Sequence, residues 1–496
     1  MDSLGVVFVV VRRVLYARLR FFGKGCMDFK KFVDSFTTMT CIMSVEKFPD
    51  GSYGNIRIVT GNKAYIDSIE NMPGDGPKML TNKFIPNSDY QRYLQKDLNF
   101  EDFCYRCAIL KQPLHTYVHP DRFDFWFNIF MMPLESDEEN IGYCTYSQEL
   151  SREADTSQMS NLSQQVASDV LNSCIKLRGS EGFKSKMAEV IKDIRVLCHA
   201  KYCFILQMDY TNRTCSLLGE SVFYEPGMAR NLSWFCFDFF DIADSFADTI
   251  AGSNCLIIKN EQDMEFVREK NPEWYKSLKE AGIERIALFP IKKGDELLGY
   301  IWVTEFDAND SVRIKSTLEL TTYFIASEIY NHQLFEKLRI LSTMDMLTGV
   351  FNRNEMNNRV NQLIAESDEE KTSLGVVFTD LNGLKQMNDN KGHAAGDTLL
   401  KNAAAMLRIV FAGSEIFRAG GDEFLIMIRN TTLSELEGLV DQLKKQSSAS
   451  GAVSFATGYA FVDDSRDVRK AMKSADEKMY EDKSQFYKDC PEKRRR

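Results

Sequence analysis

Acidic residues stand at the ends of apolar runs at two places in the last third of the sequence. Asp380 follows the apolar run 374–379, and Asp422 with Glu423 follows the dipeptide Gly420-Gly421 between two more apolar runs. Short apolar runs of this kind are typical of buried strands, and a Gly-Gly turn suits a tight hairpin. If the hairpin lies beside the strand that ends at Asp380, the three carboxylates converge.

Such a convergence indicates a particular ion. Adjacent carboxylates repel one another unless a cation lies between them. Oxygen ligands without a nearby cysteine or paired histidine favour Mg²⁺ or Mn²⁺ over zinc, and Mg²⁺ usually completes its coordination with phosphate oxygens. The sequence therefore predicts a site for a divalent metal ion and a nucleoside triphosphate.

A polar stretch, 382–397, separates the two acidic places, and no packing pattern explains it. Asn388 and Asp397 have the hydrogen-bonding groups to read guanine, because a carboxylate accepts from its ring N–H and amino group while an amide both donates and accepts. Adenine would leave the carboxylate unpaired. Lys385 could meet a phosphate as a point charge.

Three stretches in this region, DMLTGVFNR (345–353), DLNGLKQMNDNKGHAAGD (380–397) and RAGGDEF (418–424), resemble the GGDEF domain, the catalytic module of diguanylate cyclases. They occur in the order and at the spacing of that family, over residues 341–490, which makes the likeness specific. The resemblance implies a ferredoxin-like α/β fold related to nucleotide cyclases. It also implies a nucleotidyltransferase reaction that condenses two GTP into cyclic di-GMP with release of two pyrophosphates.

The same resemblance implies roles for individual residues. Asp380, Asp422 and Glu423 would bind the metal with the backbone carbonyl of Leu381, and Asp422 would also accept a proton. Asn388 and Asp397 would contact guanine, with His393 in the same substrate loop. Lys385 and Lys483 would face phosphate. Each domain holds one GTP, so two domains must face each other in a homodimer.

The sequence departs from the family pattern in two places. Tyr487 stands where an arginine is usual, next to Lys488, and the window 411–414 lacks the Arg-x-x-Asp motif of product inhibition. We therefore expect no tight cyclic di-GMP feedback at that window. The substitution at Tyr487 keeps open an alternative function, a weak or inactive GGDEF module that binds GTP or a partner protein in signalling.

The elements before this region predict an α/β multidomain chain. Between residues 28 and 150, short apolar runs alternate with polar turns in a pattern that resembles a PAS-like α+β domain. The polar segment 151–164 marks a boundary. Residues 165–335 contain two strand pairs, the second with Gly294-Asp295 at its turn, and resemble a GAF-like α/β domain. Both would be sensor domains for an unidentified small-molecule or redox signal.

A connecting helix is predicted over residues 318–344. Its residues Leu320, Phe324, Leu334, Leu338 and Leu341 fall on one heptad seam, with Ser327 and Asn331 between them. Two interpretations stay open: a helix that only packs on its own GAF-like sheet, or a parallel dimer stalk in which Asn331 sets the register.

Composition excludes several classes of protein. The 496 residues are 44% hydrophobic and 27% charged with a net charge of -10, which indicates an ordinary multidomain globular protein and argues against nucleic acid as a partner. Most of the 12 cysteines lie before residue 256, which predicts reduced thiols and a cytoplasmic location. Cys104, Cys107, His115 and His119 could be zinc ligands, but cysteines on a helix face are the favoured interpretation.

The N-terminal segment 1–27 is apolar at first and then basic. The apolar run 4–11 is too short to cross a bilayer and precedes Arg12 and Arg13, so neither an integral membrane segment nor a signal peptide is expected. Two alternatives are open: peripheral contact of the basic residues with an anionic membrane, or a true initiation site at Met27.

Overall fold

The computed structural model describes residues 28–71, 79–120, 123, 125–153, 164–179, 182–223, 239–250, 253–369, 371–450 and 453–489. The chain divides into two compact units, residues 1–330 and 331–496. The segment 1–27 and most of the expected boundary 151–164 lie outside the described residues, and the interpretations placed on them are untested.

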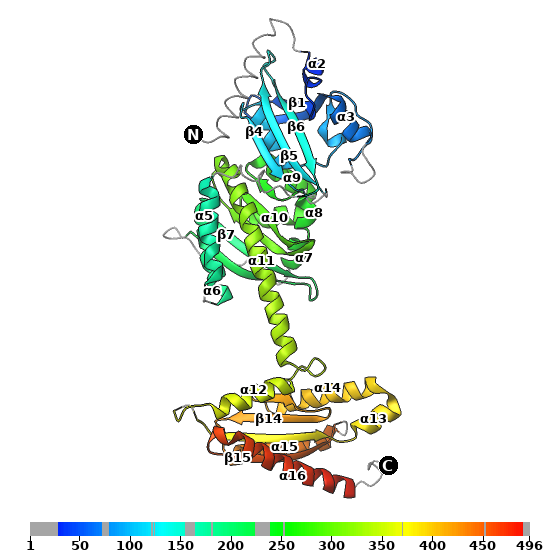
Figure 1. Ribbon diagram of the computed structural model, residues 1–496, viewed down its shortest axis with the longest axis vertical. Coiled ribbons are helices and arrows are strands. Elements are labelled where there is room, and N and C mark those ends of the chain that lie inside the picture. The colour runs from blue at the N-terminus through cyan, green and yellow to red at the C-terminus, as the bar shows by residue number, and fades with distance from the viewer. Residues whose placement is uncertain are drawn as a thin grey trace. The chain divides into compact units, whose positions relative to one another are not determined.

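The first sheet of the N-terminal unit has six antiparallel strands in the order β3-β2-β1-β6-β5-β4 (Figure 1). Four apolar runs of the sequence form β1, β2, β5 and β6, whereas the two-residue strand β3 was not predicted. The strands are β1 Met39–Lys47, β2 Tyr53–Gly61, β3 Ser88–Asp89, β4 Leu114–Val118, β5 Trp126–Leu134 and β6 Ile141–Ser151, and the helices are α2 Phe29–Val33, α3 Lys63–Glu70 and α4 Leu98–Ala108.

The second sheet has five strands in the order β8-β7-β11-β10-β9. Both expected strand pairs are antiparallel hairpins, and Gly294 at the second turn has the positive φ of 60° that glycine adopts readily. The strands are β7 Tyr202–Asp209, β8 Thr214–Val222, β9 Leu256–Ile258, β10 Ile286–Lys293 and β11 Glu296–Thr304, and the helices are α5 Gln164–Ile175, α6 Phe183–Leu197, α7 Phe239–Asp244, α8 Phe246–Ile250, α9 Glu261–Lys270 and α10 Pro272–Glu280.

Helix α11, Ser311–Thr343, follows the second sheet and continues into the C-terminal unit. Its first part packs on the core of the second sheet through Ile314, Leu318, Ile325 and Ile329. Beyond Tyr330 its apolar residues are exposed, with Leu334, Leu338 and Leu341 at 45%, 57% and 58%. The two interpretations of this helix therefore apply to different parts of it: its first part packs on its own sheet, and its last part leaves an apolar stripe uncovered.

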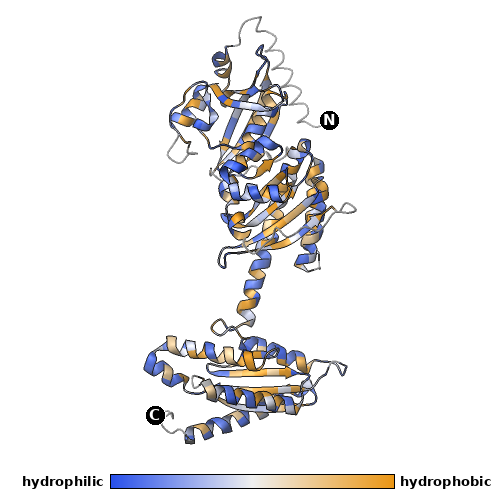
Figure 2. Cartoon of the chain, turned by 180° about the vertical axis from the view of Figure 1, so that it is seen from behind, coloured by the Kyte–Doolittle hydropathy of each residue, from blue (hydrophilic) through white to orange (hydrophobic). Residues whose placement is uncertain are grey.

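The C-terminal unit is built on four antiparallel strands in the order β13-β14-β12-β15, with strands and helices alternating as β-α-β-β-α-β, the order of ferredoxin-like sheets. Its strands are strongly apolar (Figure 2). The strands are β12 Leu374–Leu381, β13 Glu415–Arg418, β14 Glu423–Arg429 and β15 Phe455–Val462, and the helices are α12 Arg353–Ile364, α13 Leu384–Lys391, α14 His393–Val410, α15 Leu433–Ser450 and α16 Val468–Asp489.

The alternative zinc set is not assembled. Cys104 and Cys107 lie on the buried face of α4, as the favoured interpretation predicted. His115 Nε2 is 2.5 Å from Asn128 Oδ1, and the ring of His119 packs against Trp126. Across the described residues, no group of three or more His, Cys, Asp or Glu side chains is arranged to hold a metal ion by itself.

Within the described residues, none of the helices combines the length and the apolar character that a membrane crossing requires.

Candidate functional site

Strand β12 places Asp380 at the end of the C-terminal sheet. Successive side chains of a strand point to opposite faces, so the even positions of β12, which include Leu374 and Val376, pack in the cluster beneath α12 and α16. The odd positions Val377 and Leu381 pack in the other cluster, against α14 and α15. Asp380 therefore faces α16, and only 2% of it is exposed.

The predicted hairpin β13–β14 pairs beside β12, with Asp380 directly opposite Glu423. The backbone N–H of Leu381 donates a 2.9 Å hydrogen bond to the carbonyl oxygen of Asp422. A Cβ on Gly420 would lie 2.5 Å from Glu423 Oε2, so the Glu423 carboxylate lies close over the turn. The hairpin thus lies beside the Asp380 strand, as expected, while the convergence of the three carboxylates stays a prediction, since no three acidic side chains of the described residues form a group that could hold a metal ion.

Helix α16 brings Lys483 to the same place. A Cβ on Gly458 of β15 would lie 2.1 Å from the carbonyl oxygen of Ala475, so the helix approaches the strand closely there. Further along α16, Asp482 Oδ2 accepts a 2.8 Å hydrogen bond from the backbone N–H of Thr457 in β15. This bond holds the part of the helix that carries Lys483 against the strand. Lys483 Nζ then lies 2.5 Å from Asp380 Oδ2.

The electrostatics of Asp380 indicate a site for a cation. Burial raises the pKa of Asp380, the ion pair with Lys483 opposes that rise, and the charges of Asp422 and Glu423 add to it. Burial acts to lower the pKa of Lys483, but the ion pair with Asp380 outweighs it, and the net pKa is raised. Asp380 Oδ1 is buried and has no hydrogen-bond partner among the described residues. A buried carboxylate oxygen left unpaired is costly unless a ligand satisfies it.

The predicted guanine contacts lie on α13 and α14. Asn388 Oδ1 would be 1.9 Å from a Cβ on Gly396, so the amide of α13 rests on the backbone of α14 next to Asp397. His393 and Asp397 stand four residues apart in α14, on the same face, and both are exposed. Lys385 is exposed in the first turn of α13. The amide of Asn388 thus lies against α14 at Gly396, one position before Asp397, while Lys385, His393 and Asp397 are exposed.

Sequence reasoning assigned no position to Arg418, and the structure gives it a clear one. Its Nη1 lies 3.1 Å from both carboxylate oxygens of Asp345, and its Nη2 donates to the carbonyl oxygen of Gly421 at 2.7 Å. Thr348 holds Asp345 through its N–H and its hydroxyl. Arg418 therefore ties the Gly-Gly turn to the segment that follows α11. The sequence feature that could have indicated this contact is an arginine two positions before Gly420.

We expect Asp345→Ala to destabilise the C-terminal unit by about 1–3 kcal/mol, because the change leaves the half-buried guanidinium charge of Arg418 without its carboxylate partner. Burial acts to raise the pKa of Asp345, but hydrogen bonds from Thr348 and the charge of Arg418 outweigh it, so the net pKa is lowered. This stabilisation is therefore complete above the pKa of the unfolded chain and is lost as the pH falls through the lower pKa of the folded state.

Scanning calorimetry at neutral and acidic pH checks this. Asp368→Ala is the matched control, because Asp368 pairs with Arg466 at an exposed position. Equal melting temperatures of the two variants at neutral pH would contradict the prediction that Asp345 stabilises the unit through its ion pair with Arg418.

Tyr487 lies one turn after Lys483 on α16, half-buried, with its ring against Phe486. It contributes to the electrostatic environment of Lys483. The structure therefore brings Asp380, Glu423, Asp422, Lys483 and Tyr487 to one end of the sheet.

Comparison with known protein families matches residues 342–488 to a family described as "Diguanylate cyclase, GGDEF domain". An Escherichia coli cyclic di-GMP phosphodiesterase, PdeR, is 39% identical over 109 residues, which cover 22% of this chain and 16% of that protein. An uncharacterized membrane protein of Staphylococcus epidermidis is 31% identical over 153 residues, which cover 28% of this chain and 43% of that protein. The chain thus spans less than half the length of either relative.

Among solved structures, the coiled coil and GGDEF domain of DgcB from Caulobacter crescentus, in complex with c-di-GMP, is 22% identical with a TM-score of 0.31 and covers 34% of this chain and 95% of that one. A sensory box/GGDEF family protein from the same organism is 32% identical with a TM-score of 0.26, over 29% of this chain and 99% of that one.

The C-terminal part of the chain is thus a GGDEF domain that follows a long helix, and a GGDEF domain implies cyclic di-GMP signalling. The family match does not extend over the two N-terminal sheets, whose PAS-like and GAF-like interpretations stay predictions.

Proposed function

We propose that the GGDEF domain at residues 342–488 makes this protein a diguanylate cyclase, which condenses two GTP into cyclic di-GMP with release of two pyrophosphates. One observation carries the proposal: Asp380 and Glu423 lie opposite each other on neighbouring strands, with Asp422 beside them and one buried oxygen of Asp380 unpaired. This is a place for a cation and the phosphates that accompany it.

The residues fit a divalent metal ion. Asp380 Oδ1 is an orphaned buried acceptor, and Asp422 and Glu423 add carboxylates within electrostatic range of it. We propose that these three side chains, with the carbonyl of Leu381, hold Mg²⁺ or Mn²⁺. In the protein alone, Lys483 neutralises part of this charge, and it would turn to the triphosphate when nucleotide binds. When bound, the metal ion offsets negative charge on the triphosphate and on the departing pyrophosphate.

Guanine recognition is assigned to Asn388 and Asp397. The half-buried amide of Asn388 in α13 lies against the backbone of α14 at Gly396, and the exposed carboxylate of Asp397 belongs to the next residue of α14. A carboxylate that accepts from two N–H groups of guanine loses both bonds with adenine. His393, on the same face of α14, would border the substrate, and Lys385 would face phosphate.

In the proposed reaction, the 3′-oxygen of one GTP attacks the α-phosphorus of the other. The new bond joins that oxygen to phosphorus, the bond from phosphorus to the bridging oxygen breaks, and pyrophosphate carries away the electron pair. Asp422 accepts the proton of the hydroxyl. Lys385 and Lys483 stabilise charge on the phosphates. The same reaction between the remaining 3′-hydroxyl and the remaining α-phosphorus releases the second pyrophosphate and closes the ring.

Two GGDEF domains must face each other, because each holds a single GTP. We propose a homodimer formed through the last part of α11, where Leu334, Leu338 and Leu341 are spaced at four and three residues and are exposed. Asn331, exposed one turn before them, would set the register. The PAS-like and GAF-like domains, 28–150 and 165–335, would pass a small-molecule or redox signal to this helix.

The direct test is incubation of the purified protein with GTP and Mg²⁺, followed by chromatography for cyclic di-GMP. The product is expected with GTP and absent with ATP. A protein that binds GTP but forms no product would favour the second candidate, a non-catalytic signalling module. Tyr487 supports that candidate, since the family usually has an arginine at that position.

The metal assignment predicts a stability effect that can be measured without turnover. A ligand that binds only the folded protein stabilises it by about 2.7 kcal/mol at a hundredfold excess over its Kd. We therefore expect Mg²⁺ with a non-hydrolysable GTP analogue to raise the melting temperature of the natural protein and to leave that of Asp380→Asn unchanged. An equal rise in both proteins, measured by scanning fluorimetry, would remove Asp380 from the metal site.

A further inference from the structure

A cavity of about 200 Å³ lies within the N-terminal unit, outside the GGDEF domain. Its walls come from α4, from strands β4 and β5 of the first sheet, and from β9 and the first part of α11. An apolar cavity of about 150 Å³ can take up benzene. A space of this size therefore accommodates a molecule with one or two rings.

The cavity has flat aromatic walls. The rings of Tyr117 and Trp126 stack on each other with centroids 4.9 Å apart and an interplanar angle of 14°. Phe103 and Tyr323 line the space as well. Aromatic faces and edges of this kind favour a planar, aromatic guest.

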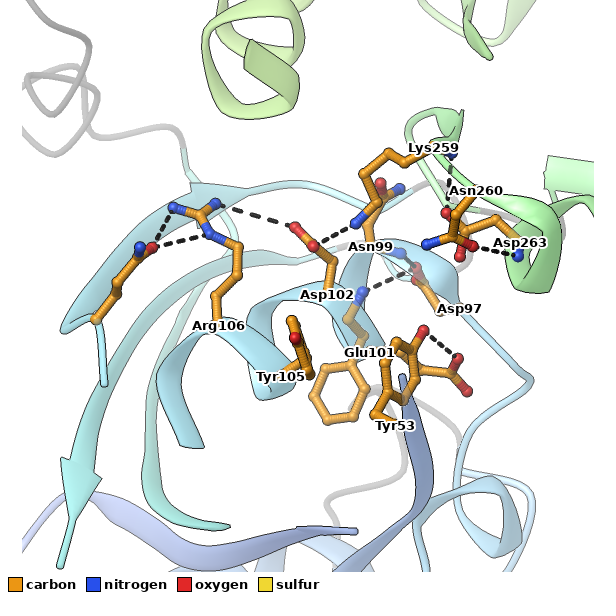
Figure 3. Close-up of polar contacts among 12 residues, drawn as sticks. Tyr53, Asp97, Asn99, Glu101, Asp102, Tyr105, Arg106, Lys259, Asn260 and Asp263 are labelled. Carbon is orange, nitrogen blue, oxygen red and sulfur yellow. Dashed lines mark hydrogen bonds and ion pairs between the residues drawn. The ribbon is translucent and has the colours of Figure 1, made fainter. Parts of the chain in front are cut away.

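The charged side chains that line the cavity include one more cation than anion. Asp102 pairs with both Lys259 and Arg106, and Figure 3 shows its carboxylate between them. The second acid, Glu319, accepts a 2.8 Å hydrogen bond from the neutral amide of Asn254 and interacts electrostatically with Lys315, four residues before it in α11. Three basic side chains thus face two acids, so the lining carries a net positive charge.

The remaining cation is Lys315 of α11. Its Nζ lies over the ring of Phe103, 4.9 Å from the centroid. Across the part of the chain that the structure describes, this half-buried ammonium makes neither a hydrogen bond nor an ion pair. A partly desolvated ammonium of this kind gains from an anionic ligand.

Lys315 also borders a second cavity, of about 90 Å³, that reaches into the first sheet. The two cavities have Asn99, Phe103, Thr116 and Lys315 in common. The smaller one is closed by the buried tyrosines Tyr90 and Tyr93. The ammonium of Lys315 therefore stands where a ligand in either space could reach it.

We propose that the larger cavity binds a small aromatic monocarboxylate, with its ring among Tyr117, Trp126 and Phe103 and its carboxylate on Lys315. Such a ligand bridges the first sheet and α11. Because α11 continues to the GGDEF domain, the ligand acts on the helix that leads to the output domain. Control of turnover by this ligand rests on the proposed function, whereas binding itself does not.

Isothermal titration calorimetry of the full chain without nucleotide tests the site. The probes are benzoate and indole-3-carboxylate, with neutral indole as the comparison. We expect at least one acid to bind the natural protein at least about tenfold more tightly than indole, and Lys315→Met to remove that preference, since one charge-assisted contact is worth about a factor of ten or more. Lys315→Arg should keep it.

Two further variants complete the test. Ser316→Phe fills the space from α11 and should abolish binding of every probe, whereas Lys184→Met removes an exposed lysine of α6 and should bind like the natural protein. Binding of neither acid, equal affinity for indole, or unchanged affinity in Lys315→Met would each overturn the proposal. Cyclic di-GMP production, measured separately, reports on the proposed function alone.

Discussion

Asp422→Ala is expected to lower the rate of cyclic di-GMP formation from GTP by about 10³-fold or more, while the protein stays folded. The side chain is assigned both to the metal site and to the acceptance of the proton, and loss of groups in those positions typically has effects of this size. The contact that Asp422 makes with β12 uses its backbone carbonyl, which accepts from the N–H of Leu381 and is unchanged by alanine.

Asp463→Ala is the matched control for this prediction. Asp463 is exposed and directly follows Val462, the last residue of β15, which pairs with Leu374 at the start of β12. Asp380 pairs with Ala456, at the other end of β15. The control thus removes a carboxylate from the opposite end of the sheet. Chromatographic assays on both variants, with melting temperatures, separate catalysis from folding. Full activity in Asp422→Ala would refute the assignment of the site.

Leu338→Glu is expected to convert the protein to a monomer and to reduce turnover by more than tenfold at low protein concentration. Leu338 is 57% exposed in the single chain, and the spacing to Leu334 and Leu341 places the three on one seam. Burying a leucine of this kind stabilises a dimer by roughly 1.5–3 kcal/mol in each chain, and a glutamate on the seam replaces that gain with repulsion.

Sedimentation equilibrium and turnover against protein concentration check the dimer prediction. Gln333→Glu adds the same charge away from the seam and should leave both the dimer and its activity intact. A Leu338→Glu protein that stays dimeric and fully active would show that α11 does not join the two chains in the working enzyme.

The GGDEF domain of the C-terminal unit, and the strand and turn that carry its acidic residues, could be predicted from the sequence because the signals are local. The apolar run before Asp380 forms β12, and Gly420-Gly421 forms a turn between two short strands. Both features depend on neighbouring residues alone, through alternation and turn chemistry. Asn388 and Gly396, which precedes Asp397, are likewise close in sequence and lie against each other.

Strand β3, in contrast, was not predicted, because Ser88 and Asp89 are polar and form no apolar alternation. It is held by pairing with Arg57 and Ile58 of β2 and not by its own composition. The connecting helix was predicted, but the point at which its apolar face leaves the second sheet was not. That point depends on where the sheet ends, which no heptad pattern records.

The sequence by itself determined which family the C-terminal domain matches and which residues are proposed to bind metal, phosphate and guanine, since the motifs depend on residue identity and short spacings along the chain. Only the tertiary structure decided that Lys483 meets Asp380 across 103 positions, that Arg418 is held by Asp345, and that Lys315 borders a cavity. These contacts join segments distant in sequence. Their geometry comes from strand pairing and helix packing, to which many residues contribute together.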